Sequence, residues 1–252
     1  MDMQNRDSEN PGVEVGKASV DAIMYAARLV RPGARLLDVA EASEKYLREK
    51  GYAPAFPINL SVNHRAAHYS PSLDDAAVFC ETDVVKVDFG AEKNGVLGDG
   101  AITVDLSGNH SDMVDAAEGA LDAAMSKVRA GVKVREIGRE IERIIESAGF
   151  SPIRNLGGHG IGINELHGGV FIPNYDNGDA TELEEGQTVA IEPFATDGKG
   201  LVREEEICEI YTFAGHASVR SPVARKVLAR IEKDYHENPF AARWLSNGQP
   251  YG

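Results

Sequence analysis

An α+β fold built from two similar halves is expected from this sequence of 252 residues. Residues 22–57 and 120–155 resemble each other, and each copy has the pattern of two amphipathic helices followed by an extended segment. Between and after the copies, short segments of alternating apolar residues are typical of β-strands. The segment from Ser221 to Leu245 is helical again and has no counterpart in the repeat.

The repeat rests on identical residues at equivalent positions of the two copies. These pairs are Ala22/Ala120, Ala26/Ala124, Val30/Val128, Arg31/Arg129, Gly33/Gly131, Glu44/Glu142, Gly51/Gly149 and Pro54/Pro152. Chance similarity between two amphipathic helix pairs is the competing explanation. The repeat is favoured because each copy leads to a histidine, His68 in the first half and His159 in the second. Two related halves that each supply a histidine predict a pseudo-twofold domain with its site where the halves meet.

Each copy is expected to contain two helices separated by an Arg-x-Gly break. In the second helix of each copy, apolar residues recur at the spacing of one helical face. These residues are Leu36, Val39, Ala40 and Leu47 in the first copy and Ile137, Ile141, Ile144 and Ile145 in the second. Gly51 and Gly149 stand where glycine commonly ends a helix.

Strands are predicted at residues 84–89 and 101–106, with a turn at Asn94-Gly95 between them. A shorter strand is predicted at 188–191. In the last helical segment, the apolar stripe consists of Val223, Val227, Leu228 and Ile231. The expected organisation is a disordered acidic tail at 1–12, a main domain at 13–200 and an incomplete helical subdomain at 201–252.

Composition restricts the possible functions. The formal net charge of −14 at pH 7 argues against binding to a phosphate backbone. No apolar run reaches the roughly 18–20 residues that cross a bilayer, and residues 1–10 lack the apolar segment of a secretory signal. Cys80 and Cys208 are far apart in sequence, which favours isolated reduced thiols over a disulfide. We expect a cytoplasmic protein that binds neither membrane nor nucleic acid.

Two aspartates flank the predicted turn. A two-residue loop at Asn94-Gly95 would place Asp88 opposite Ala101, and Asp99 would then lie on the adjacent diagonal. A loop centred on Lys93-Asn94 would instead place the two aspartates directly opposite each other. Like charges this close repel unless a cation lies between them. Solvated hairpin carboxylates are the alternative, and the pair taken alone favours that alternative.

Glycines surround the most informative histidine. His159 lies in the segment 157–167, which contains four glycines and a second histidine, His167. Glycine-rich backbone can approach a ligand closely and adopt φ > 0, so this segment indicates a site rather than a core. Glu192 follows the predicted strand at 188–191 in an apolar context, where an unpaired carboxylate is costly. A structural ion pair is the alternative for Glu192.

The remaining histidines carry weaker signals. His68 follows two alanines, and a lone histidine beside small residues is usually a satisfied loop or core residue. No role is assigned to the histidines in polar surroundings, which are His64, His110, His216 and His236.

The candidates together favour a metal centre. Carboxylate oxygens with one imidazole suit Mn, Fe, Co or Zn. Two such ions lower the pKa of a bridging water and polarise a carbonyl, and further histidines can orient substrate and move protons. The sequence has no P-loop, no usable dinucleotide fingerprint, no CxxC and no GxSxG motif.

At this point the sequence resembles a known family, the methionine aminopeptidases with the pita-bread fold. The resemblance extends from Val13 to Leu245, and its motifs lie at residues 63–71, 87–104, 158–175 and 190–194. The pattern His-Gly-Ile-Gly from His159, with Glu-Leu-His-Gly-Gly from Glu165 and Ile-Pro-Asn-Tyr from Ile172, is similar to the type II branch of archaea and eukaryotes. Residues 225–245 resemble the helical insertion of that branch.

The resemblance implies roles for individual residues. It implies that two divalent ions (Co, Mn, Fe or Zn) are held by Asp88, Asp99, His159 and Glu192, with Asp99 bridging. Glu192 would also accept a proton, while His167 would stabilise the oxyanion and His68 would assist at the amide. The side chains that would line the methionine pocket are Phe56, Leu166 and Phe194. The implied reaction removes the initiator methionine from nascent chains with a small second residue, near the ribosome, by a monomeric enzyme.

One departure from the family pattern is expected to matter. The family has a fifth ligand, a second bridging glutamate in a Gln-x-Glu-His-Thr-like segment beyond the helical insertion, and this sequence has no such segment before Gly252. We therefore expect either a truncated enzyme that lacks C-terminal strands or a chain that has lost the reaction.

Two alternative functions are considered. A proline-directed peptidase of the same fold would have different pocket residues and no helical insertion, so residues 225–245 count against it. A non-catalytic pita-bread protein that binds ribosomes or nucleic acid ranks lower, because four ligand positions are intact and the chain is acidic.

Overall fold

The computed structural model describes residues 10–205, 208–216 and 218–246, which form two compact units. The first unit consists of the described residues among 1–106, 163–166 and 206–252, and the second of residues 107–162 and 167–205. These units do not follow the predicted boundary near residue 200, because the C-terminal segment belongs with the N-terminal half. Of the predicted disordered tail, residues 1–9 lie outside the described part of the chain.

The first helix begins inside the predicted tail. Helix α1 (Pro11–Leu29) starts with proline at its first position, where the missing N–H costs nothing. Asn10 caps the helix, because its Oδ1 accepts a hydrogen bond from the Gly12 amide at 2.9 Å. Residues 10–12 are therefore part of a capped helix and not of a tail.

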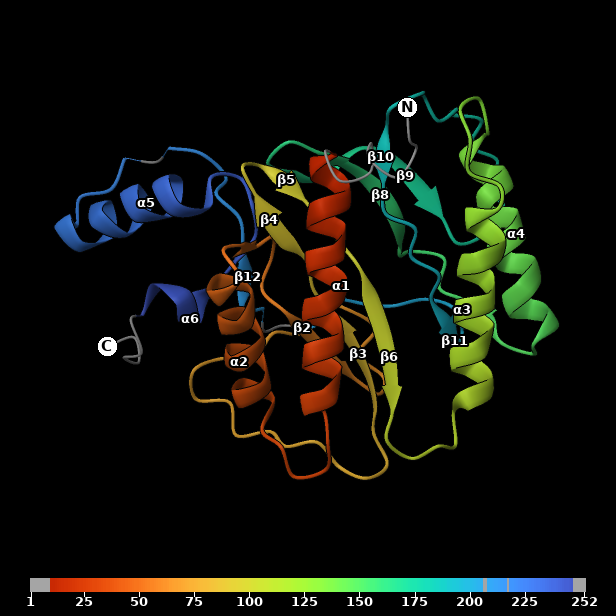
Figure 1. Cartoon of the computed structure of the whole chain (residues 1–252), viewed down its shortest axis with the longest axis horizontal. Coiled ribbons are helices and arrows are strands. Elements are labelled where there is room, and N and C mark those ends of the chain that lie inside the picture. Colours follow the sequence, from red (N-terminus) through yellow and green to blue (C-terminus); the bar gives the residue numbers. More distant parts are fainter. Residues whose placement is uncertain (1–9, 206–207, 217, 247–252) are drawn as a thin grey trace, which may run out of the picture. The chain divides into compact units, whose positions relative to one another are not determined.

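In the first unit, two helices pack on two small antiparallel sheets. The helices are α1 and α2 (Leu36–Glu49). One sheet has the order β2 (Asn59–Val62), β3 (Val84–Asp88), β6 (Ala101–Asp105), and the other has the order β1 (Ala53–Pro54), β4 (Ala91–Lys93), β5 (Val96–Leu97). Helix α1 contacts strands of both sheets and lies across β3 and β6 in Figure 1. Their shared core includes Leu60, Val85, Val87 and Phe89, all fully buried.

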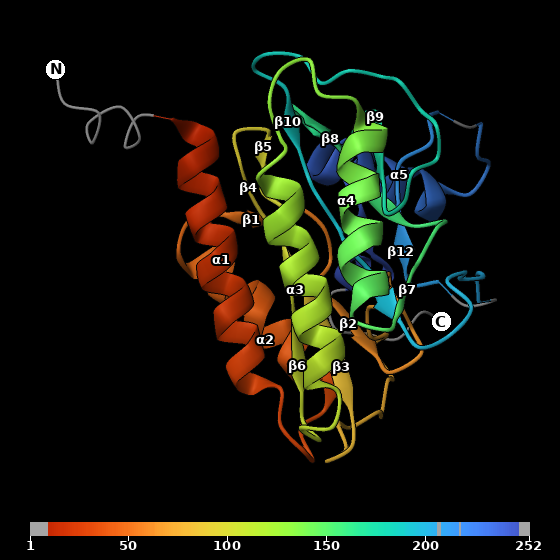
Figure 2. The ribbon, with the colours of Figure 1, turned by 90° about the vertical axis from the view of Figure 1, so that its right-hand side faces the viewer.

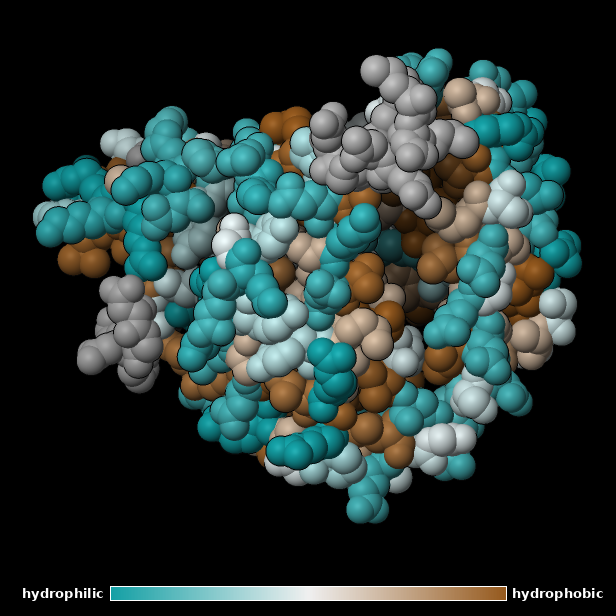
Figure 3. All heavy atoms as spheres, in the orientation of Figure 1, coloured by the Kyte–Doolittle hydropathy of each residue, from teal (hydrophilic) through white to brown (hydrophobic). Residues whose placement is uncertain are grey.

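The C-terminal segment completes the first unit. Its elements are β12 (Ile210–Tyr211), α5 (Pro222–Tyr235), β13 (Phe240–Ala241) and α6 (Ala242–Leu245). The predicted helix at this position is confirmed, but its apolar stripe is only partly covered: Ile231 is buried, whereas Val223 is 70% exposed. Figure 3 shows mostly hydrophilic side chains over α5. None of the helices in the described part of the chain is both long enough and apolar enough to span a membrane.

The second unit repeats the helix pair and adds a different sheet. Helices α3 (Ser111–Met125) and α4 (Val134–Ser147) run side by side (Figure 2). The strands are β7 (Ser151–Pro152), β8 (Gly157–Gly162), β9 (Glu165–Pro173), β10 (Thr188–Val189) and β11 (Ala195–Thr196). Strand β8 lies between β10 and β9, and β7 pairs with β11. Ile137, Ile141 and Ile145 of α4 are fully buried, as their spacing predicted.

The internal repeat is confirmed by the order of elements. Helix α1, helix α2 and strand β1 correspond to α3, α4 and β7. The equivalent glycines also have equivalent conformations: Gly33 and Gly131 lie between the helices with φ of 81° and 78°, and Gly51 and Gly149 follow them with φ of 85° and 87°. Because other residues rarely adopt these φ values, the repeated glycines fix the same two chain reversals in each half.

Candidate metal centre

The two aspartates lie on one ribbon of the first unit. Strand β3 pairs with β6 so that Asp88 is opposite Ala101, and on the other side of Gly90 the ribbon continues with Glu92 opposite Leu97. Asn94-Gly95 forms the two-residue turn, with φ of 54° and 82°. The two-residue loop is therefore the correct alternative, and Asp99 lies two residues before the partner of Asp88.

Sequence alternation explains which way these carboxylates face. Val85 and Val87 of β3 are fully buried in the core, so Lys86 and Asp88 point to the opposite face of the sheet. Gly90 keeps the ribbon continuous between its two parts, because a Cβ at this position would lie only 1.9 Å from the Gly98 carbonyl oxygen. Any larger residue at position 90 would push the strands apart next to both aspartates.

The second unit brings two histidines and a glutamate together. Strand β8 carries His159, which is 9% exposed, and β9 carries the exposed His167; their ring centroids are 4.3 Å apart. His159 and Ala190 exchange both backbone hydrogen bonds, at 3.1 and 2.8 Å. Glu192 follows two residues later, and its Oε1 lies 3.0 Å from His159 Nε2. The Glu192 carboxylate is thus paired with a histidine of the same candidate set.

The hydrogen bonds of His159 fit a metal ligand. Its Nδ1 lies 3.1 Å from the Gly160 carbonyl oxygen, which can only accept a hydrogen bond, so Nδ1 carries the proton. Nε2 faces the Glu192 carboxylate, with Oε1 3.0 Å away, so either a proton or a metal ion fits between the two atoms. Histidine ligands of metals usually donate their other ring N–H in this way. An imidazole nitrogen beside a carboxylate oxygen is a donor set that suits Mn, Fe, Co or Zn.

The glycines beside His159 have a different role from the predicted one. Gly158 and Gly160 do not adopt positive φ; instead, a Cβ would lie 2.1 Å from the Ala190 carbonyl oxygen at one position and 2.2 Å from that of Gly168 at the other. Both glycines are required because the neighbouring strands come very close to β8. They hold the backbone of His159 between β10 and β9 rather than making room for a ligand.

His68 lies on a loop of the first unit in a strained conformation. Its φ of 62° is in the left-handed region, which non-glycine residues seldom adopt except where surrounding structure holds them. The next residue is tied to β2, because Tyr69 O accepts a hydrogen bond from Leu60 N at 2.7 Å. His68 itself is exposed. An exposed side chain on a held, strained backbone is typical of a functional position.

The three predicted pocket residues are divided between the units. Phe56 and Leu166, of the first unit, are 5% and 7% exposed, and Phe194, of the second, is partly buried. The ring of Phe56 lies against Gly90 of the aspartate ribbon. The first unit thus contains Asp88, Asp99 and Phe56, and the second unit contains His159, His167 and Glu192.

Residues without a predicted role form a second polar cluster in the first unit. Glu44 and Arg243, both almost fully buried, are hydrogen-bonded to each other. A signal was available in the sequence, because Glu44 falls among the apolar positions of α2 and is repeated as Glu142. Nothing in the sequence pointed to Arg243 as its partner.

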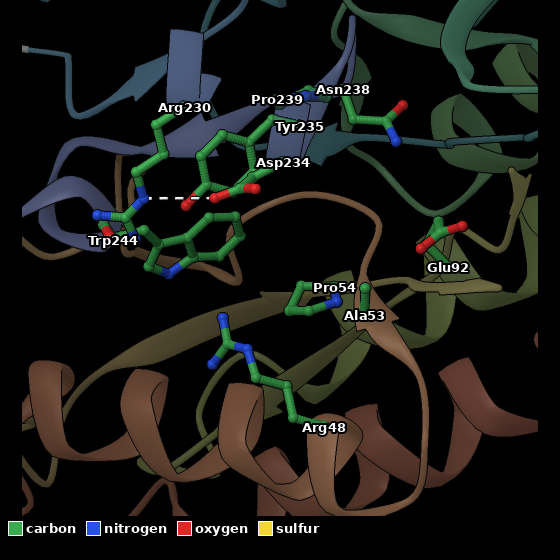
Figure 4. A pocket seen from close by; sticks show the side chains of 10 residues that line it. All are labelled: Arg48, Ala53, Pro54, Glu92, Arg230, Asp234, Tyr235, Asn238, Pro239 and Trp244. Carbon is green, nitrogen blue, oxygen red and sulfur yellow. Dashed lines mark hydrogen bonds and ion pairs between the residues drawn. The ribbon is translucent and has the colours of Figure 1, made fainter. Parts of the chain in front are cut away.

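Beside this cluster is a cavity of about 450 Å³, shown in Figure 4. None of its lining residues belongs to the predicted site. They are Arg48, Ala53, Pro54, Glu92, Arg230, Asp234, Tyr235, Asn238, Pro239 and Trp244. Both cysteines are free and exposed, as expected.

Comparison with known proteins agrees with this geometry. The model of metallopeptidase family M24 matches residues 13–235. A methionine aminopeptidase of Archaeoglobus fulgidus is 47% identical over 233 residues, which are 92% of this chain and 80% of the relative.

Two solved structures share the fold. The methionine aminopeptidase of Thermotoga maritima superposes with a TM-score of 0.72 at 29% identity, over 81% of this chain and 85% of that protein. The prolidase of Pyrococcus furiosus superposes with a TM-score of 0.63 at 25% identity, over 72% of this chain and 55% of the prolidase. Both likenesses identify the pita-bread fold. The chain therefore belongs to metallopeptidase family M24, in which it groups with the methionine aminopeptidases.

Proposed function

We propose that this chain is a metal-dependent aminopeptidase that removes the N-terminal methionine from nascent proteins whose second residue is small. The observation that carries this proposal is the 47% identity with a methionine aminopeptidase across nearly the whole chain. It is supported by the cluster of His159, His167 and Glu192, which supplies suitable chemistry within one unit.

The divalent metal is held by Asp88, Asp99, His159 and Glu192. When bound, divalent ions in a carboxylate–imidazole site acidify water and polarise a carbonyl group. Each ligand fits through its own surroundings: the aspartates face away from the core on one ribbon, and His159 has its Nδ1 committed to a carbonyl. The family resemblance implies that these four residues would hold two ions.

The other roles of the polar side chains are proton transfer and stabilisation of the charge that develops in the reaction. Glu192 accepts the proton that the attacking water loses, and it is poised beside His159 to do so. His167 donates a hydrogen bond to the oxyanion that develops on the carbonyl, and His68 assists at the amide of the scissile peptide. General acid–base help of this kind contributes roughly 10²- to 10⁴-fold in rate. Phe56, Leu166 and Phe194 form the apolar pocket for the methionine side chain.

The chain belongs to the type II branch and acts in the cytoplasm as a monomer near the ribosome. Residues 225–245, whose sequence resembles the type II helical insertion, support the branch assignment because α5 and α6 lie in this part of the chain. Free cysteines and a net charge of −14 agree with a cytoplasmic enzyme that does not bind nucleic acid directly.

Peptide hydrolysis tests the proposal. We expect the purified protein with added Co²⁺ or Mn²⁺ to release methionine from Met-Ala-type tripeptides. Peptides with a bulky second residue should be cleaved much more slowly, and the Glu192→Gln variant should be inactive. Failure of the metal-loaded protein to cleave any Met-Ala peptide would favour the non-catalytic alternative.

A proline-directed peptidase is the second candidate, because a prolidase shares the fold at 25% identity. The same assay separates the two activities when dipeptides of the X-Pro type are included. We expect no turnover of X-Pro substrates. Preferential cleavage of X-Pro over Met-Ala peptides would reverse the assignment.

A further inference from the structure

The side chain of Arg243, in the C-terminal helix α6, joins three separate parts of the first unit. It is 5% exposed. Its Nη2 donates to Glu44 Oε1 on α2. Its Nη1 donates to Ser70 Oγ at 2.8 Å and to the Pro71 carbonyl oxygen at 3.0 Å. Ser70 and Pro71 lie two and three residues after His68 in the loop after β2. Arg243 therefore contacts the side chain of the first and the backbone of the second.

Glu44 fixes Arg243 in this position. Its carboxylate is 2% exposed, and both oxygens are used: Oε1 by Arg243, and Oε2 by Trp244 Nε1 at 2.7 Å. A buried carboxylate persists only when it is paired and hydrogen-bonded in good geometry. The buried pair therefore leaves the guanidinium little freedom, and its second nitrogen is aimed at the loop.

A cavity lies beside these hydrogen bonds. It has a volume of about 450 Å³ and lies between the C-terminal segment and the end of α2 with β1, and polar and apolar residues both line it. In Figure 4 Arg48 and Trp244 lie next to each other, with the Arg48 guanidinium 5.4 Å from the centroid of the Trp244 ring. Apolar packing also holds the C-terminal segment, since Ile231, Phe240 and Ala241 are buried. The hydrogen bonds of Arg243 and Trp244 add specific polar contacts to this packing.

The loop needs such a hold. His68 has a φ of 62°, a conformation that a non-glycine residue keeps only when its surroundings over-determine it. On one side, Asn63 is fixed by a hydrogen bond from Lys86 Nζ to its carbonyl oxygen at 2.7 Å. On the other side, Ser70 and Pro71 accept from Arg243. His68 lies between two anchored ends.

We propose that Arg243 is a positioning residue for His68, which ties the active-site loop of the first unit to the C-terminal segment. This inference rests on the proposed role of His68 at the substrate amide. Arg243 does not itself touch substrate. Its effect passes through Ser70 and Pro71 to the backbone of His68, so the C-terminal helices have a direct influence on the reaction.

The test compares Arg243→Lys and Ser70→Ala with a matched control in the full-length chain. Lysine keeps the charge beside Glu44, but its donors are on one nitrogen, whereas Arg243 reaches Glu44 and the loop with two different nitrogens. Ser70→Ala leaves the buried pair intact. The control is Arg230→Met, because Arg230 is an arginine of the same segment that donates to the Trp244 and Leu245 carbonyl oxygens. We expect Arg243→Lys to lower kcat/KM roughly 10- to 100-fold, as small misplacements of a reacting group do, with unchanged metal content. Ser70→Ala should lower it less, and the control should stay within about twofold of the wild type.

Two readouts separate positioning from loss of structure and from failure of the proposed function. The NMR resonances of the His68 ring, identified with His68→Ala, should move in Arg243→Lys and Ser70→Ala but not in Arg230→Met. The activity loss of Arg243→Lys should also shrink strongly in the His68→Ala background. If His68→Ala is fully active, the proposed function of His68 is wrong, whereas the ring resonances still test the positioning. Unmoved His68 resonances in both variants, or full additivity with His68→Ala, would overturn the proposal.

Discussion

At the scale of single residues, surroundings distinguish the three candidate histidines. His159 is nearly buried, its Nδ1 faces a carbonyl oxygen and its Nε2 faces a carboxylate, which is the environment of a ligand. His167 and His68 are exposed, and His68 has a strained backbone. Exposure is what a group that meets substrate requires. The different roles proposed for these histidines thus rest on their neighbours and not on the residue type.

The first prediction follows from this distinction. His159→Ala should lose both metal and activity. His68→Ala and His167→Ala should keep their metal and lower kcat/KM by roughly 10²- to 10⁴-fold. Metal content is measured on dialysed protein by atomic emission, and His110→Ala serves as the control. A drop in metal stoichiometry for His68→Ala equal to that for His159→Ala would contradict the assigned roles.

At the scale of elements, the sequence predicted the positions of the helices, but it did not explain why glycine is required in strand β8. Apolar spacing located α2 and α4, because one face of a helix must be buried and the period is fixed. The sequence also shows the glycines of β8 as unusual. They are required because β9, which follows a turn, and β10, which is more distant in sequence, come close to β8. Local patterns reveal that a glycine is unusual, and only the assembled sheet shows why.

The second prediction uses two glycines with opposite surroundings. Gly160→Ala should lower the free energy of unfolding by at least about 1–3 kcal/mol, because its Cβ would meet the Gly168 carbonyl oxygen at 2.2 Å. Gly16→Ala should raise it by roughly 0.5–1 kcal/mol, because Gly16 lies inside α1 with open space around it. Urea unfolding of both variants measures the difference. Equal effects of the two substitutions would rule out strand contact as the reason for Gly160.

The third prediction concerns pH and strand β3. Burial lowers the pKa of Lys86 from its usual 10.5 to about 8. The folded protein therefore binds this proton less tightly than the unfolded chain, and stability increases with pH wherever the unfolded chain holds more protons. Below pH 8 the folded protein carries the full destabilisation from the buried Lys86 ammonium. This destabilisation disappears as the pH rises toward 10.5, because Lys86 then loses its proton in the folded protein.

Wild-type stability should accordingly improve relative to Lys86→Met between pH 7 and pH 10, by on the order of 2 kcal/mol. Urea unfolding of both proteins at several pH values gives this difference. Lys45→Met is the control, because Lys45 is largely exposed. A constant difference between wild type and Lys86→Met over this range would show that Lys86 titrates at its usual pH.

At the scale of the whole molecule, the repeat in the sequence foretold two units with the same order of elements. The candidate ligands divide in the same way, with two aspartates in the first unit and a histidine and glutamate in the second. The pairing of Glu44 with Arg243 could not be foreseen, because 199 positions separate them and no local pattern connects them. Long-range polar partners of this kind are decided by tertiary packing alone.

The fourth prediction tests whether the proposed ligand set acts as one site. A metal that binds only the folded protein should stabilise it by about 2.7 kcal/mol at about 100 times its Kd. Calorimetry should therefore show a higher Tm for the wild type with Mn²⁺ than without it. Asp99→Asn, in the first unit, and His159→Ala, in the second, should each abolish this increase, and the double variant should show no further loss. Asp112→Asn, an exposed aspartate of α3, should keep the full increase. If Asp99→Asn responds to Mn²⁺ as the wild type does while His159→Ala does not, the metal is held by the second unit alone, and Asp99 has no place in the ligand set.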